Sequence, residues 1–305
     1  MGSETRVSLA SMRLKVTFLL CLAAVLAFVA SGCGGSSKKS SAPPSASCKV
    51  ADLNLVKAGQ LAVGTDNPAF PPWFGGTPPK GSTWKVSDPN SSQGFESAVA
   101  YAVADKLGFP KSEVKWTVVP FNSSYAPGPK KFDFDINQIS VTPARKKVVD
   151  FSDPYYVAPQ GVVTGKGSTL KVSKISDLKD AEIGVQIGTT SLDAVKNVIM
   201  PSKDPKVFND SNDVVTALKQ NQVDAIVTDL PTAFYITAAQ VPGSTIVGQF
   251  NTGEGDSFGL LLEKDSHLTP CLDKAIGELT ASGELKKITD KWMGKAAGAP
   301  ELELR

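Results

Sequence analysis

The sequence predicts an α/β protein in which two mainly parallel sheets are each flanked by helices. Short apolar runs of strand length alternate with segments whose apolar residues recur at helical spacing. This alternation occurs in the first half of the chain and again between residues 181 and 228, before two helical segments near the C-terminus. A twice-repeated α/β pattern favours two α/β units over a single continuous sheet.

The first unit begins with a strand at Gln60–Thr65, which ends in a turn rich in Asp, Asn and Pro. Residues 66–90 form a loop that contains several prolines. Glu96–Leu107 predicts a helix because its apolar residues fall on one face, and a glycine follows it. Val114–Phe121 and Phe132–Ile139 are the next two strands. The order strand, helix, strand, strand is typical of a sheet that is covered by helices.

The second unit repeats the pattern, and the joints between the units are expected near 155–159 and 249–257. Its segments are a strand at Ala181–Gln186, a helix opening at Gly188–Thr190, a helix at Asp213–Gln220 and a strand at Val223–Thr228. The C-terminal helices are expected at Leu268–Leu279 and Glu284–Met293.

Composition argues against several classes of function. Residues 33–305 contain 29 basic and 29 acidic side chains, and a neutral body lacks the basic footprint of nucleic-acid binding proteins. The single histidine, His267, lies in a polar turn, where we expect it to be solvated rather than catalytic. The four cysteines show no CxxC spacing, so we expect no zinc site, and no cofactor is implied.

The N-terminus has the order of an export signal. Arg13 and Lys15 precede the apolar run Val16–Ala30, which is too short to span a bilayer. Small residues then lead to Cys33, and this order resembles the lipobox of bacterial lipoproteins. The resemblance implies that residues 1–32 are a signal peptide, with Met12 as an alternative start, and that Cys33 carries a lipid. An ordinary secreted protein that is cut nearby is the alternative.

Residues 33–48 are small, polar and Pro-containing, so we expect a flexible tether between the lipid and the folded body. Cys21 lies within the signal, which leaves Cys48 and Cys271 for the mature protein. A location outside the cytoplasm permits a disulfide between these two residues. Two buried free thiols are the alternative.

A candidate ligand site follows the strand Phe132–Ile139. Thr142 is a favourable N-cap and Pro143 suits the first position of a helix, so a helix is expected to begin where the strand ends. Open α/β sheets bind ligands at this edge, and a helix N-terminus favours an anion. Arg145 can pair with a carboxylate through two parallel hydrogen bonds. A capped helix with a solvated arginine is the alternative.

Residues 140–156 continue as Ser-Val-Thr-Pro-Ala-Arg-Lys-Lys-Val-Val-Asp-Phe-Ser-Asp-Pro-Tyr-Tyr. This run resembles the most recognisable segment of the polar amino-acid solute-binding proteins of ABC transporters, the bacterial extracellular solute-binding protein family 3. Further matches follow the same order: Val63–Asp66, Gly94–Glu96, Gly184–Thr190, Val223–Asp229 and Asp290–Gly294. The resemblance covers about residues 58–295 and implies a type II periplasmic-binding fold, in which two lobes close on a ligand.

The resemblance implies the lobe boundaries and the roles of individual residues. Lobe 1 would comprise 49–156 and 251–297, lobe 2 would comprise 157–250, and 298–305 would be a C-terminal tail. Arg145 would bind the substrate α-carboxylate with help from Ser140, Thr142, Thr189 and Thr190. Asp229 would bind the α-ammonium, Asp66 would contact the ligand side chain, and Phe70 and Phe121 would flank it.

Four departures from the family pattern bear on the side-chain end of the site. Gly75–Ser92 is longer than the usual loop, Asn67 is an extra residue, Tyr125–Lys131 replaces a helical stretch, and Asn137–Gln138 replaces smaller residues. The extra residue leaves open whether Phe70 or Trp73 faces the cleft. Glu96 is expected to complement the helix dipole rather than to touch the ligand.

We therefore expect an extracytoplasmic solute-binding component of an ABC importer, anchored to the bacterial membrane by its lipid. It would be a monomer that binds a free polar amino acid and delivers it to permease subunits. One alternative is a dehydratase-like enzyme on the same fold, which would need a general acid in the cleft. The other is a ligand-sensing lipoprotein, although no transmembrane segment or kinase follows residue 297.

Overall fold

The structure is a computed structural model that describes residues 47–253, 255–294 and 298–304. The expected signal peptide, the lipidated Cys33 and all but the last two residues of the expected tether lie outside the described residues. In the part of the chain that is described, no helix combines the length and apolar character needed to cross a membrane.

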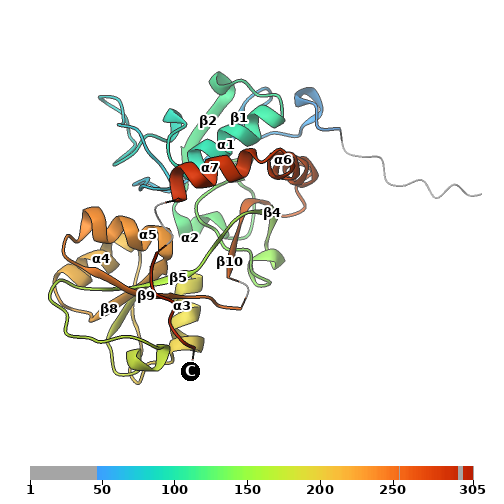
Figure 1. Ribbon diagram of the computed structural model, residues 1–305. Helices are drawn as coiled ribbons and strands as arrows, with labels where there is room; N and C mark the ends of the chain where they lie inside the picture. Colours follow the sequence, from blue (N-terminus) through green and yellow to red (C-terminus); the bar gives the residue numbers. More distant parts are fainter. Residues whose placement is uncertain (1–46, 254, 295–297, 305) are drawn as a thin grey trace, which may run out of the picture. The chain divides into compact units, whose positions relative to one another are not determined.

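The first sheet has five strands in the order β2-β1-β3-β10-β4. Figure 1 labels four of them, β1, β2, β4 and β10. Strand β1 pairs in parallel with β2 and β3, whereas β10 is antiparallel to both β3 and β4. The strands are β1 (Leu61–Thr65), β2 (Val114–Val118), β3 (Phe134–Asp135), β4 (Val149–Ala158) and β10 (Asp256–Glu263).

The second sheet also has five strands, in the order β7-β6-β8-β5-β9. Strand β6 pairs in parallel with β7 and β8, and β5 is antiparallel to β8 and β9. The strands are β5 (Gln160–Thr164), β6 (Ile183–Gln186), β7 (Lys206–Phe208), β8 (Ala225–Asp229) and β9 (Thr245–Phe250). The predicted α/β class is thus confirmed, and both sheets are mixed, because each is completed by antiparallel strands that the sequence analysis did not identify.

Helices cover both sheets, and apolar side chains fill the space between the layers. The helices are α1 (Phe95–Lys106), α2 (Phe121–Ser124), α3 (Thr190–Ala194), α4 (Ser211–Lys219), α5 (Leu230–Tyr235), α6 (Thr269–Ala281) and α7 (Glu284–Met293). Asp210 caps α4 by accepting from the backbone N–H groups of Asn212 and Asp213. Gly94 precedes α1 with a φ of 87°, and a Cβ there would lie 2.4 Å from the Phe74 backbone, so the position requires glycine.

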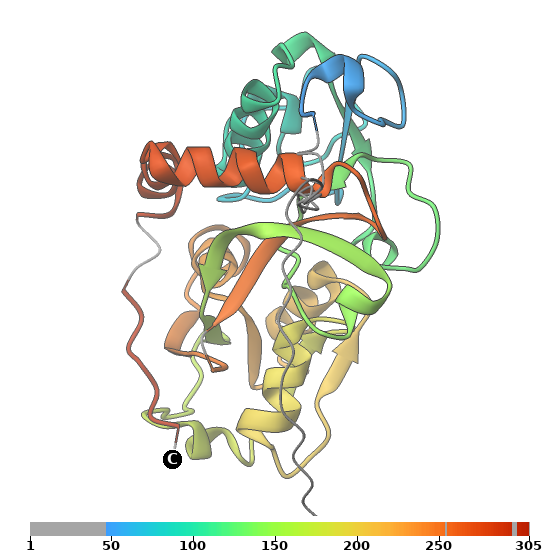
Figure 2. The same ribbon diagram turned by 90° about the vertical axis from the view of Figure 1, so that its right-hand side faces the viewer.

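Two segments connect the sheets. β4 leads through Pro159 into β5, and residues 251–255 join β9 to β10. In Figure 2 the first crossing, drawn in light green, runs between the two groups of elements. The expected Cys48–Cys271 disulfide is present in the first group, where it connects the segment before β1 to α6.

The C-terminal segment packs on the second sheet, although α7 packs against α1 and α6 of the first group of elements. The Gln249 N–H donates to the Pro300 carbonyl at 2.7 Å, and the Leu302 N–H donates to the Gln249 carbonyl at 2.8 Å. Leu302 is buried among the apolar residues of the second sheet and lies over Gly248, where a Cβ would come within 2.4 Å of its side chain. Figure 2 shows this dark red segment running along the second group of elements.

Candidate functional site

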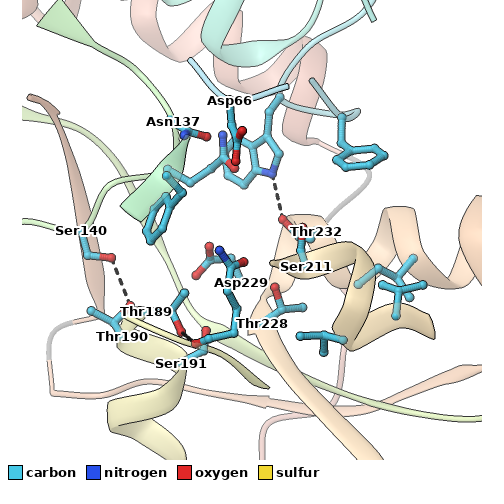
Figure 3. A pocket seen from close by; sticks show the side chains of 18 of the residues that line it. Asp66, Asn137, Ser140, Thr189, Thr190, Ser191, Ser211, Thr228, Asp229 and Thr232 are labelled. Carbon is cyan, nitrogen blue, oxygen red and sulfur yellow. Dashed lines mark hydrogen bonds between the residues drawn. The ribbon is translucent and has the colours of Figure 1, made fainter. Parts of the chain in front are cut away.

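A pocket of about 980 Å³, part of it open to solvent, is lined by residues from both sheets. Its first wall comes from the loops after β1 and β3, and its second wall from the segments after β6 and β8 with α4 and α5. Ligands bind open α/β sheets at the carboxyl ends of their strands, and both walls meet this condition. Figure 3 shows the polar side chains that converge on the pocket from the two sides.

Eight of the nine residues that the sequence analysis assigned to the substrate line this pocket. They are Asp66, Phe70, Phe121, Ser140, Arg145, Thr189, Thr190 and Asp229. The ninth, Thr142, is not among the lining residues. The fold thus brings together residues that are far apart in the sequence.

Thr142 positions the backbone of Arg145 instead. Its hydroxyl accepts from the Arg145 N–H at 3.2 Å. The helix expected after Thr142 is only a short turn of 3-10 helix at Arg145–Lys147, because the chain enters β4 at Val149. The expected anion site at a helix N-terminus is therefore absent, and Arg145 is the source of positive charge on this wall.

The Arg145 guanidinium is buried between the walls. Its Nη1 donates to the Ser140 carbonyl at 2.6 Å on its own wall, and its Nη2 donates to the Gly188 carbonyl at 2.8 Å on the opposite wall. The ring of Tyr125 lies 4.7 Å from the guanidinium carbon and that of Phe121 lies 5.6 Å away. A guanidinium has five N–H donors, so donors remain for a ligand carboxylate.

Asp229 is the acidic counterpart on the second wall. It is the last residue of β8, and part of its surface is open to the pocket. Its Oδ1 accepts from Gln160 Nε2 at 3.1 Å. Burial, together with the nearby carboxyl of Asp256, raises the pKa of Asp229 to about 7. A cationic group in the pocket would stabilise the ionised form of this enclosed carboxyl.

Asp66 lies at the other end of the pocket, directly after β1. It caps its own turn by accepting from the Asn67 N–H at 2.7 Å, and it also lines the pocket. Burial raises its pKa, and the charge of Asp210 acts in the same direction. Two carboxyls near one end of a pocket favour a donor-rich or cationic ligand group there.

Two aromatic residues of the first wall, Phe70 and Trp73, were candidates for facing the cleft. In the structure both of them line the pocket. Phe70 packs against Tyr235 of α5, with ring centroids 5.8 Å apart. Trp73 is only 2% exposed, and its Nε1 donates to Thr232 Oγ1 of the second wall at 2.8 Å. Trp73 thus adds a hydrogen bond between the walls that the sequence alone did not reveal.

The insertion at Gly75–Ser92 supports this first wall from behind. The Ala69 N–H donates to the Lys85 carbonyl at 3.2 Å, and the Asn67 side chain donates to the Thr83 carbonyl at 2.9 Å. The extra residue Asn67 therefore anchors the insertion to the pocket loop. The insertion shapes the pocket indirectly, because none of its residues lines it.

The sequence analysis missed several polar lining residues. On the second wall they are Gln186, Ser191, Ser211, Thr228 and Thr232, and on the first wall Thr65 also contributes. Asn137 and Gln138, noted only as departures, line the first wall as well. Ser191 and Thr228 adjoin predicted residues at strand ends, so their place after a strand was a usable signal. Thr232 carried no local signal.

Glu96 lies in the first turn of α1, as expected, and is not among the residues lining the pocket. Its carboxyl is fully buried and accepts from the Gln138 backbone N–H at 2.7 Å, and also from the Gln138 side chain and the Tyr155 hydroxyl. Burial raises its pKa to about 7. Glu96 therefore holds the loop after β3 in place.

No cluster of three or more His, Cys, Asp or Glu side chains in the described residues is arranged to hold a metal ion. His267 is exposed and lies away from the pocket.

Comparison with known proteins extends these observations. The family model described as bacterial extracellular solute-binding proteins, family 3, matches residues 76–295. The chain is 32% identical over 203 residues to the arginine-binding extracellular protein ArtP of Bacillus subtilis (strain 168), covering 65% of this chain and 77% of ArtP.

The chain is also similar to solved structures of amino-acid-binding proteins. The chain is similar to an ancestral arginine-binding protein bound to glutamine, with a TM-score of 0.64 and 35% identity over 78% of this chain and 99% of the other. It is also similar to the ancestral amino acid-binding protein AncCDT-1, a precursor of cyclohexadienyl dehydratase. That match has a TM-score of 0.61 and 28% identity over 77% of this chain and 95% of the other.

Proposed function

This chain belongs to the bacterial extracellular solute-binding proteins of family 3, and we propose that it captures a free polar amino acid without transforming it. Two lobes would close on the ligand, lobe 1 with residues 49–156 and 251–297 and lobe 2 with residues 157–250. The closed complex would then deliver the amino acid to the permease subunits of an ABC importer. The protein would act as a monomer.

The observation that carries this proposal is the placement of opposite charges on opposite walls. Arg145 belongs to lobe 1 and Asp229 to lobe 2, and both line one pocket. A free amino acid presents a carboxylate and an ammonium, so it can pair with both residues at once. Both pairs form only when the lobes are close, and the ligand therefore favours the closed state. Ser140, Thr189 and Thr190 would complete the polar surroundings.

The ligand side chain would extend toward Asp66, with Phe70 and Phe121 along its stem. A carboxylate accepts from a guanidinium, an ammonium or an amide. Aromatic rings can stack on a guanidinium or flank an aliphatic stem. We therefore propose a cationic or amide side chain. The similar proteins are in keeping with this, since one is named arginine-binding and another was solved with glutamine bound.

A thermal-shift screen against the twenty amino acids tests the function, because a ligand that binds the folded state raises its stability. Arg145→Ala should weaken binding of the best ligand by about 30-fold to several-thousand-fold, the equivalent of roughly 2–5 kcal/mol for one lost partner of a buried charge pair. Lys147→Ala is the matched control, because Lys147 lies exposed on the same turn. If no amino acid shifts the melting temperature, or Arg145→Ala binds within threefold of the parent, the proposal is wrong.

We also propose that a lipid on Cys33 anchors the protein at the outer face of the membrane. The support is the order of basic, apolar and small residues before this cysteine. Cys33→Ser should release the protein into the medium or the soluble fraction, and unchanged retention in the membrane fraction would contradict the anchor.

A dehydratase activity is the competing proposal, favoured by the similarity to AncCDT-1. Asp229 has a pKa near neutrality, which suits a general acid. Incubation with arogenate separates the two functions, because a binding protein leaves it unchanged and a dehydratase forms phenylalanine.

A further inference from the structure

Gln160 lies behind the pocket with its side-chain amide held in one orientation. Its Oε1 accepts from the Ser191 hydroxyl at 2.6 Å. The Ser191 hydroxyl donates to the amide oxygen, and an ionised carboxylate can only accept, so Nε2 points toward the carboxyls. Nε2 donates to Asp229 Oδ1 at 3.1 Å and to Asp256 Oδ2 at 2.6 Å. One amide nitrogen thus joins two carboxyls.

These side chains lie at the two crossings between the sheets. Gln160 is the first residue of β5, directly after the first crossing, and it is paired with Asp229 in the second sheet. Asp256 is the first residue of β10, directly after the second crossing, and it belongs to the first sheet. The bond between Gln160 and Asp256 therefore connects the two lobes at the hinge, and both residues are buried there.

The hydrogen bonds continue to the opposite end of the ligand site. The Thr190 hydroxyl lies near enough to Asp256 to lower the pKa of its carboxyl, and it lies 3.1 Å from the Ser140 hydroxyl oxygen. The Ser140 carbonyl in turn accepts from Arg145. A connected set of polar contacts thus runs behind the pocket from Asp229 to Arg145, and it passes three times between the lobes.

We propose that Gln160 and Asp256 are positioning residues that hold the Asp229 carboxylate toward the ligand ammonium. The proposal rests on the proposed function, because it assumes that an amino acid binds at Asp229. Gln160 orients Asp229, Ser191 fixes the amide of Gln160, and Asp256 fixes Gln160 from the other lobe.

The charges around Asp229 predict a specific pH dependence of ligand affinity. Burial and then Asp256 raise the pKa of Asp229, Glu96 adds to the increase, and Gln160 and Arg145 oppose it. The Tyr156 hydroxyl also lies within electrostatic range of Asp229, and Asp193 and Arg145 lie within electrostatic range of Asp256.

An ammonium binds the ionised carboxylate, so affinity is full above the pKa of Asp229 and is lost as pH falls through it. With a pKa of about 7, the parent should lose up to about 30-fold in affinity between pH 8.5 and 5.5, close to tenfold for each unit below the pKa.

The two positioning residues act on this pKa in opposite directions. Asp256→Asn removes a like charge but keeps an oxygen that can accept from Gln160, so the pKa of Asp229 should fall and the loss of affinity should move to lower pH. Gln160→Met removes a donor to the ionised carboxylate, so the loss should move to higher pH. A role in folding alone would change affinity by the same factor at every pH.

Isothermal titration with L-arginine and with L-glutamine from pH 5.5 to 8.5 tests the proposal, because both ligands keep their ammonium charge in this range. Asp150→Asn is the matched control, since Asp150 lies on β4 and pairs with the exposed Lys264, so its profile should follow that of the parent. If Gln160→Met fails to fold, Ser191→Ala releases the amide of Gln160 and should shift the profile in the same direction by a smaller amount.

Profiles that move in opposite directions for Asp256→Asn and Gln160→Met support the proposal. Profiles parallel to that of the parent, or shifts in one direction for both variants, overturn it and leave the proposed function intact. A parent protein that binds none of the twenty amino acids overturns the proposed function, and this inference with it.

Discussion

The hydrogen bond between Trp73 and Thr232 predicts how strongly the closed state depends on contacts outside the ligand. Thr232→Val keeps the shape of the side chain but removes the acceptor for Trp73 Nε1, which lies 2.8 Å away. Trp73 is 2% exposed, so its N–H would be left buried without a partner in the closed state. Such a group costs about 1–3 kcal/mol. In the proposed open state water would reach the indole, and the cost would disappear.

The unpaired N–H would therefore destabilise the closed state and not the open state. Thr232→Val should weaken amino-acid binding by about 5- to 150-fold, at 1.4 kcal/mol for each factor of ten. Thr232→Ser keeps the hydroxyl and should bind within about threefold of the parent. Isothermal titration measures both affinities, and X-ray scattering with saturating ligand should show compaction in both variants. If Thr232→Val binds as tightly as Thr232→Ser, this bond does not contribute to closure and the reasoning is refuted.

Three further predictions concern stability. Replacing Cys48 and Cys271 by Ser should lower the free energy of unfolding by roughly 2–4 kcal/mol in urea denaturation without changing ligand affinity; two free thiols in the unreduced parent would contradict the bridge. The raised folded-state pKa of Glu96 means that its stabilising contribution is full below the unfolded value and is lost as pH rises toward about 7. Glu96→Gln should therefore flatten the decrease in unfolding free energy between pH 5 and 8, and an unchanged slope would count against this assignment. Leu302→Ala should lower the unfolding free energy by about 2 kcal/mol, and an equal loss in the exposed Leu304→Ala would show that the C-terminal segment does not pack as described.

Local pattern was enough to predict the elements whose apolar residues repeat at a fixed period. The helices α1, α4, α6 and α7 and the strands β1 and β6 lie close to the predicted segments. The long crossing strands β4 and β10 were not predicted, because their pairing joins residues 98 to 114 positions apart. The helix expected after Thr142 failed for a related reason. A favourable cap can begin a helix, but the demands of the neighbouring strand decide how far it continues.

The residues of the site also divide into those with a local sequence signal and those without one. Arg145 and Asp229 were predictable because each follows a strand within a short, specific motif. Trp73, Gln160 and Asp256 were not, because their roles depend on partners that are distant in the sequence. Trp73 bonds to a residue 159 positions away, and Gln160 bonds to one 96 positions away. A single sequence carries no local mark of such contacts.

The C-terminal segment offers a way to measure the proposed lobe motion. Helix α7 belongs to the first group of elements, whereas Leu302 is fixed to the second. Two dyes attached about ten residues apart, one on the exposed Lys291 and the other on the exposed Glu301, would therefore ride on different lobes. Energy transfer between them would report the opening angle of a single molecule in real time. The short chain between the dyes would also keep the label spacing small enough to resolve a modest rotation, which suits the design of a fluorescent amino-acid sensor.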